Sequence, residues 1–182
     1  RQTLRRLQRN GDKNDKGGIN MNRKILFRGF SPDETGEKTI YIEGNPIKGN
    51  WVYGWYCMYP FGGWPCKDAI IPTDKALNGE HCFVKVIPET VGQYTGKADK
   101  RGQKIFEGDI HYETEKSPIS GKCEYQEIKH GDFLDFWSIV DSYGFYRVTS
   151  RGECAAFDEY TTEWARIVGN VYENPELMEE SA

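Results

Sequence analysis

The segment VGQYTGKADKRGQKIFEGDI, residues 91–110, decides the fold of this chain. Glycines and charged residues break it into pieces that are too short and too rich in glycine for a helix. We expect strands at 90–94 and 104–106, with a tight polar excursion between them. The Gly-Asp pair at 108–109 then separates two apolar strand ends and is typical of a turn that launches a further strand, at 110–115. The segment therefore predicts sheet with sharp corners.

Short strand-like runs with turn residues between them recur on both sides of this segment. Seven of the eight prolines lie at or before residue 118, so residues 119–174 contain none and can form continuous sheet. No long amphipathic helix competes. We expect a turn at 141–144, a single helical turn within 157–164 and a brief helix near the C-terminus. The fold class is therefore all-β with minor α, with strands at 24–30, 39–43, 51–59, 69–71, 83–87, 122–129, 133–142, 144–150 and 166–172 in addition to those above.

Composition and turn spacing divide the chain into a leader and two β units. Residues 1–20 hold six basic and two acidic side chains and no aromatic residue. We expect them to be a basic flexible leader or a non-native extension before a natural start at Met21. The alternative is a basic arm that binds nucleic acid or an acidic partner. Residues 21–87 are expected to form an irregular N-terminal β-rich subdomain, and residues 88–178 a C-terminal SH3-like β-barrel subdomain.

Composition also bounds the class of protein. The chain has 182 residues, a net charge of −4 and 5 Trp, 11 Tyr and 9 Phe, and this much aromatic surface excludes wholesale disorder. No apolar run approaches the ~18 residues of a membrane span. Without the leader, 18 basic and 26 acidic side chains leave a net charge of −8. Such an acidic body disfavours general binding to duplex DNA.

The cysteines and histidines give little support to a catalytic or metal site. Five widely spaced cysteines, with no C-x-x-C pair and no export signal, predict reduced thiols in a cytoplasm and no zinc site. His111 and Glu113 make only half of a metal site, and no cofactor is expected. A thiol enzyme would need a cysteine beside His81, His111 or His130, whereas small buried thiols are the commoner arrangement. We predict no catalytic residue.

Three segments resemble the YopX family of phage and prophage proteins: KILFRGF at 24–30, VGQYTGKADKRGQKIFEGDI at 91–110 and IVGNVYENPEL at 167–177. The resemblance spans residues 23–178, and the two later motifs are long and specific. Lys97 departs from the family pattern, in which a leucine is more usual. The resemblance implies a mostly-β, two-part fold and a small cytoplasmic protein of a phage or an integrated element. It implies no activity and no catalytic or metal-binding residue.

Basic side chains in the central segment are candidate binding residues: Lys97, Lys100, Arg101 and Lys104. They can form a finger that contacts phosphate, while the neighbouring glycines let the backbone approach closely. The alternative, which we favour, is that the segment encodes turn geometry. A nucleotide-binding P-loop is not expected, because the predicted element after the glycines is a strand and not a helix. The expected structural turn residues of the chain are Gly92, Gly96, Gly102, Gly108, Asp109 and Pro175.

Alternation in residues 51–59 places Trp51, Tyr53 and Trp55 on one face of a strand. We expect a core or oligomer interface there, and the alternative is that Trp51 and Trp55 stack on a ligand. We therefore predict a non-enzymatic, phage-related interaction protein. It is expected to act as a homo-oligomer in the cytoplasm of a host bacterial cell, with an unidentified phage or host protein as partner and no membrane. The alternative is a nucleic-acid-binding accessory protein in phage replication or regulation.

Overall fold

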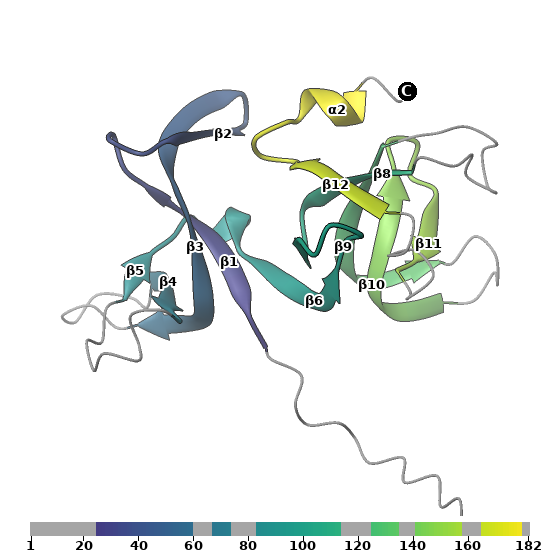
Figure 1. The fold of residues 1–182 in the computed structure, drawn as a ribbon, viewed down its shortest axis with the longest axis horizontal. Helices are drawn as coiled ribbons and strands as arrows, with labels where there is room; N and C mark the ends of the chain where they lie inside the picture. Colours follow the sequence, from purple (N-terminus) through teal and green to yellow (C-terminus); the bar gives the residue numbers. More distant parts are fainter. Residues whose placement is uncertain are drawn as a thin grey trace, which may run out of the picture.

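The computed structural model describes residues 25–59, 67–73, 83–113, 125–134, 141–157 and 165–179. In these ranges the chain is mostly β, as the sequence predicts, and forms two antiparallel sheets (Figure 1). The helical turn expected within 157–164 falls almost wholly outside the described residues. Across the same ranges, no helix has the length and hydropathy of a membrane span.

The first sheet has seven strands and is built around one long strand. The path through the sheet is β5-β4-β3-β1-β6-β7, and β2 pairs with β3 beside this path. A single 3-10 turn, Pro88–Thr90, precedes β6. The strands are β1 (Phe27–Pro32), β2 (Lys38–Ile42), β3 (Asn45–Tyr59), β4 (Lys67–Pro72), β5 (Val84–Lys85), β6 (Gly92–Ala98) and β7 (Lys104–Phe106).

Strand β3 is longer than the sequence predicts because the preceding turn is shorter. Glu43 and Gly44 both have positive φ, 49° and 78°, as a two-residue hairpin turn requires. The strand therefore begins at Asn45, in a stretch that reads as a loop in the sequence. One side of β3 pairs first with β2 and then with β4, while the other side pairs with β1. Gly54 lies where β1 and β4 both pair with β3, and a Cβ there would lie only 1.9 Å from the carbonyl oxygen of Ile71.

The second sheet has five strands in the order β11-β10-β9-β8-β12. The separate strand expected at 133–142 and the turn at 141–144 are wrong. Residues 133–134 end one strand, residues 141–144 begin the next, and Gly131 pairs directly with Gly144. Gly131 and Gly144 have φ values of 144° and 151°, which glycine adopts without the strain that other residues would have. The chain around Gly144 therefore continues as a strand where the sequence predicts a turn. The strands are β8 (Asp109–Glu113), β9 (Tyr125–Leu134), β10 (Asp141–Thr149), β11 (Cys154–Ala156) and β12 (Ala165–Asn170).

The core of the second sheet is closed by a strand of the first. Ile105 of β7 packs with Ile128, Phe157 and Ile167, and half-buried Phe145 lies against them. Each of these large side chains contributes about 1.5–3 kcal/mol relative to full exposure. Strands β11 and β12 are the two edges, and no pairing joins them within the described residues. Closure into an SH3-like barrel is therefore not confirmed.

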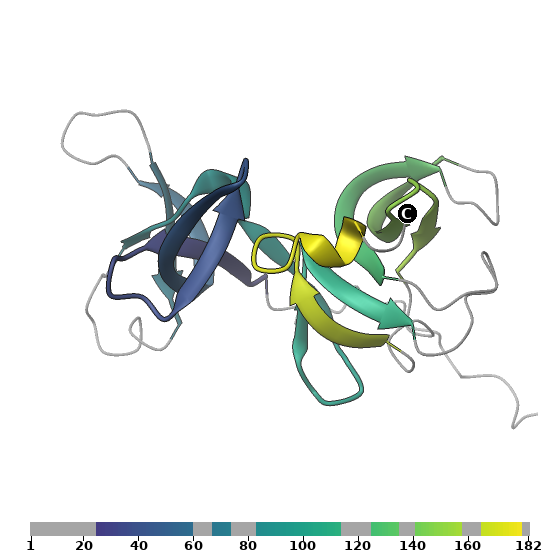
Figure 2. The same cartoon turned by 90° about the horizontal axis from the view of Figure 1, so that it is seen from above.

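The two sheets meet along a seam formed by the segment around Gly108 and by the chain after β12. The Gly108 amide donates to the Ile128 carbonyl at 2.8 Å, and the Val171 amide donates to the Gly108 carbonyl at 2.9 Å. The helix α2 (Glu176–Glu179) follows this seam. In Figure 2, α2 and β12 (both yellow) lie between the purple and blue strands of the first sheet and the green strands of the second. Strand β6 pairs with β1 through Gly92 and Gln93, so the sheets do not divide at residue 88. They divide near residue 108.

Candidate functional site

A buried ion pair joins the two sheets. Arg28 of β1 lies with its Nη1 2.5 Å from Oδ1 of Asp109, the first residue of β8, and its Nη2 donates to the carbonyl of Glu107 at 2.9 Å. Both partners are buried, with exposed fractions of 5% and 2%. The guanidinium also lies 4.7 Å from the ring of Trp51 and 5.3 Å from that of Phe106. Such contacts with aromatic faces stabilise a cation that has lost its water.

Asp109 has a second role in the turn that precedes it. Its Oδ2 accepts the backbone N–H of Phe106 at 2.8 Å, which closes the turn around Gly108. Burial raises the pKa of Asp109, whereas the Arg28 charge and the Phe106 N–H lower it. The carboxylate therefore fixes the local corner and neutralises a charge that comes from the other sheet.

A pocket of about 700 Å³ opens beside this ion pair, where the two sheets meet. We call it the inter-sheet pocket. Residues of β1, β2, β3, β8 and β12, of the loop before β7 and of the turn after β12 line it. Its charged lining residues are Arg28, Lys38, Arg101, Arg166, Asp109 and Glu173.

The acidic groups in and behind the wall of this pocket are already engaged. Glu173 accepts hydrogen bonds from Lys38 Nζ at 3.1 Å and Trp51 Nε1 at 2.5 Å, and from Asn170 Nδ2 at 3.2 Å. Asp109 is held by Arg28 as described. Arg166 and Tyr53 are among the lining residues whose side-chain donors no described residue engages. Arg166 is exposed and has no ion pair with any residue that the structure describes, and the hydroxyl of Tyr53 has no hydrogen-bond partner among them.

The loop that contains the proposed basic finger is organised by Asp99. The carboxylate of Asp99 accepts the backbone N–H groups of Arg101 at 2.8 Å and Gln103 at 2.9 Å, and that of Ile167 at 3.4 Å. The Arg101 guanidinium donates to the carbonyl of Ile167 at 2.6 Å. Burial raises the pKa of Asp99, but these N–H donors and Arg101 outweigh it, so the pKa lies below its usual value. Two side chains of the loop therefore cover the hydrogen-bonding edge of β12.

The predicted basic residues do not gather in one place. Arg101 lines the inter-sheet pocket, whereas Lys97, Lys100 and Lys104 do not. Lys97 lies with its Nζ 5.8 Å from the ring of Phe157, and Lys100 and Lys104 are exposed. Of the four candidates, only Arg101 reaches the pocket.

Trp51 lies on the face of β3 that lines the inter-sheet pocket, and strand alternation places Trp55 on the same face. Trp51 lines the pocket and packs with its ring centroid 5.4 Å from that of Phe30 and 6.2 Å from that of Tyr172. Trp55 lies four residues after Trp51 in the same strand, and its side chain is 51% exposed. Tyr53 between them is 45% exposed, and burial of its hydroxyl raises its pKa, while the Arg28 charge lowers it.

The predicted turn residues occupy several kinds of backbone. Gly102 and Gly108 have φ of 81° and 79° and lie in turns, and Gly96, with φ of 86°, lies at the register shift in the pairing of β6 with β7. Gly92 is within a strand, where a Cβ would lie 2.5 Å from the carbonyl oxygen of Glu107. Pro175 directly precedes α2.

Four charged pocket residues are absent from the sequence candidates: Arg28, Lys38, Arg166 and Glu173. Residues 28, 101–109 and 166–174 meet here, and they lie within or next to the three segments that carry the family resemblance. The three motifs of the family resemblance are therefore the sequence feature that indicates the position of the pocket. Spacing alone could not find the pocket, because its charges come from strands up to 138 positions apart, from Arg28 to Arg166.

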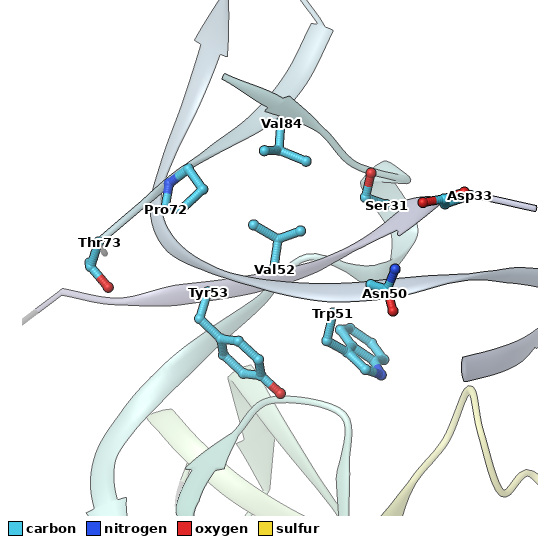
Figure 3. A pocket seen from close by; sticks show the side chains of 9 residues that line it. All are labelled: Ser31, Asp33, Asn50, Trp51, Val52, Tyr53, Pro72, Thr73 and Val84. Carbon is cyan, nitrogen blue, oxygen red and sulfur yellow. The ribbon is translucent and has the colours of Figure 1, made fainter. Parts of the chain in front are cut away.

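A second cavity, of about 500 Å³, lies on the opposite face of β3. Figure 3 shows Val52 and Val84 pointing toward each other there, while Trp51 and Tyr53 leave the strand in the opposite direction. Among its lining residues only Asp33 is charged, and Asp33 is held by the N–H and hydroxyl of Thr35. This cavity offers fewer donors to a ligand than the inter-sheet pocket.

The described residues do not assemble a metal or thiol centre. They contain no group of three or more His, Cys, Asp or Glu side chains that could hold a metal ion. Burial raises the pKa of the Cys57 and Cys154 thiols, which is opposite to what an activated nucleophile needs. His111 is buried, and its Nε2 lies 2.9 Å from Oε1 of Gln126. Cys66, Cys82, Cys123 and His81 lie outside the described residues.

The fold and the inter-sheet pocket define a mostly-β protein with a charged pocket between two sheets. The sequence model of the family described as YopX protein matches residues 64–179. This match covers more than half of the chain, so the chain belongs to the YopX family, as its motifs predict. No curated protein matches the chain.

Proposed function

We propose that this chain is a non-enzymatic interaction protein that recognises its partner through the inter-sheet pocket. One observation carries the proposal. The carboxylates of the pocket are engaged by Arg28, Lys38, Trp51 and Asn170, whereas Arg166 is left without an ion pair to any described residue. Proton transfer is most often performed by a histidine or a free carboxylate, whereas this lining holds no histidine and its carboxylates are engaged, so the pocket favours binding through hydrogen-bond donors.

The setting is part of the same proposal. Membership of the YopX family supports an origin in a phage or prophage and a place of action in the cytoplasm of the bacterial host. The partner is then an unidentified phage or host protein. The exposed donors of the pocket favour an anionic group on that partner.

Recognition by the pocket is tested by comparing two variants in extracts of phage-induced host cells. Arg166→Ala removes the unpaired cation, and Lys100→Ala removes one exposed cation outside the pocket. We expect the wild type and Lys100→Ala to retain the same partner on affinity resin and Arg166→Ala to lose it. Equal retention by all three proteins would reject the pocket as the recognition site.

We further propose that the protein acts as a homo-oligomer. Trp55 and Met58 of β3, with exposed fractions of 51% and 61%, support this, and so does the edge of β11, which pairs with no further strand among the described residues. Exposed apolar surface and open strand edges are commonly covered by a second copy. Sedimentation at high protein concentration is expected to give a species larger than one chain. A clean 21 kDa monomer would overturn it.

The second sheet, with β7 over its core, supports an SH3-like unit as the finer description of the C-terminal half. Ile105 covers the same cluster as Ile128 and Ile167, so three strands share one interior. An experimental structure that includes residues 114–124, 135–140 and 158–164 tests whether the sheet closes.

A second candidate function is that of a nucleic-acid-binding accessory protein in phage replication or regulation. It is favoured by the presence of Arg101 and Trp51 in the wall of the pocket and of exposed Trp55 on the same face of β3. Binding of single strands is expected to weaken as salt rises.

A further inference from the structure

Resting on the second candidate function, nucleic-acid binding, we infer that the inter-sheet pocket binds one phosphodiester of a single-stranded nucleic acid. Arg166 and the Tyr53 hydroxyl hold the phosphate oxygens, and the adjoining base stacks on Trp55. The argument has three parts: the charge of the pocket, the arrangement of its donors, and the aromatic surface next to it.

The pocket carries an excess of one positive charge. Its lining has four cationic side chains and two carboxylates, and Asp99 behind the wall pairs with Arg101 at 3.3 Å. Arg28 pairs with Asp109 and Lys38 pairs with Glu173. Arg166 is therefore the cation that a ligand can neutralise. A phosphodiester carries one negative charge and matches this excess.

The donors of the pocket come from both sheets. The Tyr53 hydroxyl comes from β3, and Arg166 comes from β12. A phosphate group offers several acceptor oxygens in a tetrahedral arrangement and can take donors from different sides, and arginine suits it because its planar fork can donate twice. The volume of about 700 Å³ also exceeds what a lone carboxylate fills and suits a nucleotide-sized group.

Trp55 supplies a stacking surface next to the phosphate position. It lies two residues after Tyr53 on the same strand face, a rise of about 7 Å, and is 51% exposed. Aromatic side chains stack on unpaired bases of any sequence, whereas the bases of a duplex are stacked on each other and unavailable. The arrangement therefore selects single strands with little sequence preference.

The inference predicts a shallow dependence on salt. Each phosphate neutralised on a single strand contributes a slope of about −0.7 in log K against log salt, so one contact gives a slope near −0.7. A finger of four basic residues would give a slope about four times steeper. The net charge of −4 also opposes extended contact with a polyanion.

The test measures fluorescence anisotropy of a labelled short oligothymidylate at low salt with the full chain. We expect Arg166→Ala to weaken binding about tenfold and to flatten the salt slope, and Trp55→Ala to weaken binding by about 5- to 100-fold without changing the slope. Lys100→Ala removes the same charge outside the pocket and is expected to stay within about twofold of the wild type. Circular dichroism of each variant confirms that it is folded.

The outcomes separate this inference from the proposed function. No binding by the wild type, or equal loss in Arg166→Ala and Lys100→Ala, overturns the inference. If a glutamate-rich peptide binds with the same dependence on Arg166 and the oligothymidylate does not, the pocket recognises carboxylates, and the inference falls while the proposed function stands. If the oligothymidylate binds as expected but partner capture does not depend on Arg166, the proposed protein partner is rejected and the inference stands.

Discussion

Arg28 and Asp109, 81 positions apart, form a buried ion pair with 2.5 Å between Nη1 and Oδ1, and this pair ties β1 to the start of β8. Each charge is shielded from water and is neutralised by the other. Loss of either partner leaves an isolated buried charge, which is far more costly than loss of a pair on the surface.

The first prediction concerns this pair. We expect Arg28→Ala and Asp109→Asn each to lower the free energy of unfolding by about 3–5 kcal/mol, measured by urea denaturation. The double variant Arg28→Met/Asp109→Leu removes both charges and is expected to be more stable than either single variant. Single variants within about 1 kcal/mol of the wild type would show that the pair contributes little.

The second prediction concerns the carboxylate that organises the loop before β7. Asp99→Ala removes the acceptor for three backbone N–H groups, those of Arg101, Gln103 and Ile167. We expect a loss of about 1–3 kcal/mol in unfolding free energy, because buried donors lose their partner. Lys100→Ala, at the exposed neighbouring position, is the matched control and should stay within about 0.5 kcal/mol of the wild type. Equal effects would contradict the role of Asp99.

The third prediction concerns pH. Burial, followed by the charge of Arg147, lowers the pKa of His111 from 6.5 to about 4, while the hydrogen bond with Gln126 raises it. The folded pKa lies below the unfolded value, so this contribution to stability is complete above pH 6.5. It is lost as the pH falls toward 4, because the unfolded chain then binds a proton that the folded chain does not. The loss is on the order of 3 kcal/mol.

Urea denaturation between pH 8 and pH 4 measures this effect. Carboxylates titrate in the same range, so the informative quantity is the difference between the wild type and His111→Gln at each pH. We expect this difference to change steadily below pH 6.5 and to be constant above it. Parallel stability curves for the two proteins would show that His111 is not linked to folding in this way.

The fourth prediction separates two kinds of glycine. Gly92→Ala places a Cβ 2.5 Å from the Glu107 carbonyl oxygen, a backbone atom that also accepts from Arg28. Gly102→Ala meets nothing within 4 Å but has a φ of 81°. We expect Gly102→Ala to cost about 1–2 kcal/mol from backbone strain alone. Gly92→Ala is expected to cost more, since β6 must shift away from the turn. Thermal unfolding of both variants decides the order.

The strands could be predicted because their signals are local. Residues 104–106 form a strand with the predicted bounds, and the Gly-Asp corner at 108–109 launches β8. The choice of buried face could not be predicted. Alternation places Ile25 and Arg28 on opposite faces of the chain but does not say which face is exposed to solvent. In the structure Ile25 is 62% exposed and Arg28 is 5% exposed. The reason lies 81 positions away, in the carboxylate of Asp109.

The candidate site could be predicted only in part for the same reason. Arg101 and Trp51 were among the sequence candidates and line the inter-sheet pocket. Lys97, Lys100 and Lys104 are close to Arg101 in sequence, but the turn set by Asp99 directs only Arg101 toward β12. Arg166 is isolated from other basic residues in the sequence, and Tyr53 is predicted only as part of the aromatic face of residues 51–55 and not as a donor to a ligand. Their importance arises from sheet pairing, which brings β3 and β12 to one pocket.

The covering of Ile167 by Asp99 and Arg101 limits how copies of this chain can associate. A neighbouring strand would need the amide and carbonyl of Ile167, and the chain's own side chains already occupy both. Lateral extension of the second sheet is therefore blocked at Ile167 on the β12 side, whereas no described residue pairs with the outer edge of β11. Continuous growth of a sheet needs pairing at both edges, so this cover on β12 favours two copies joined side by side through β11 over a filament.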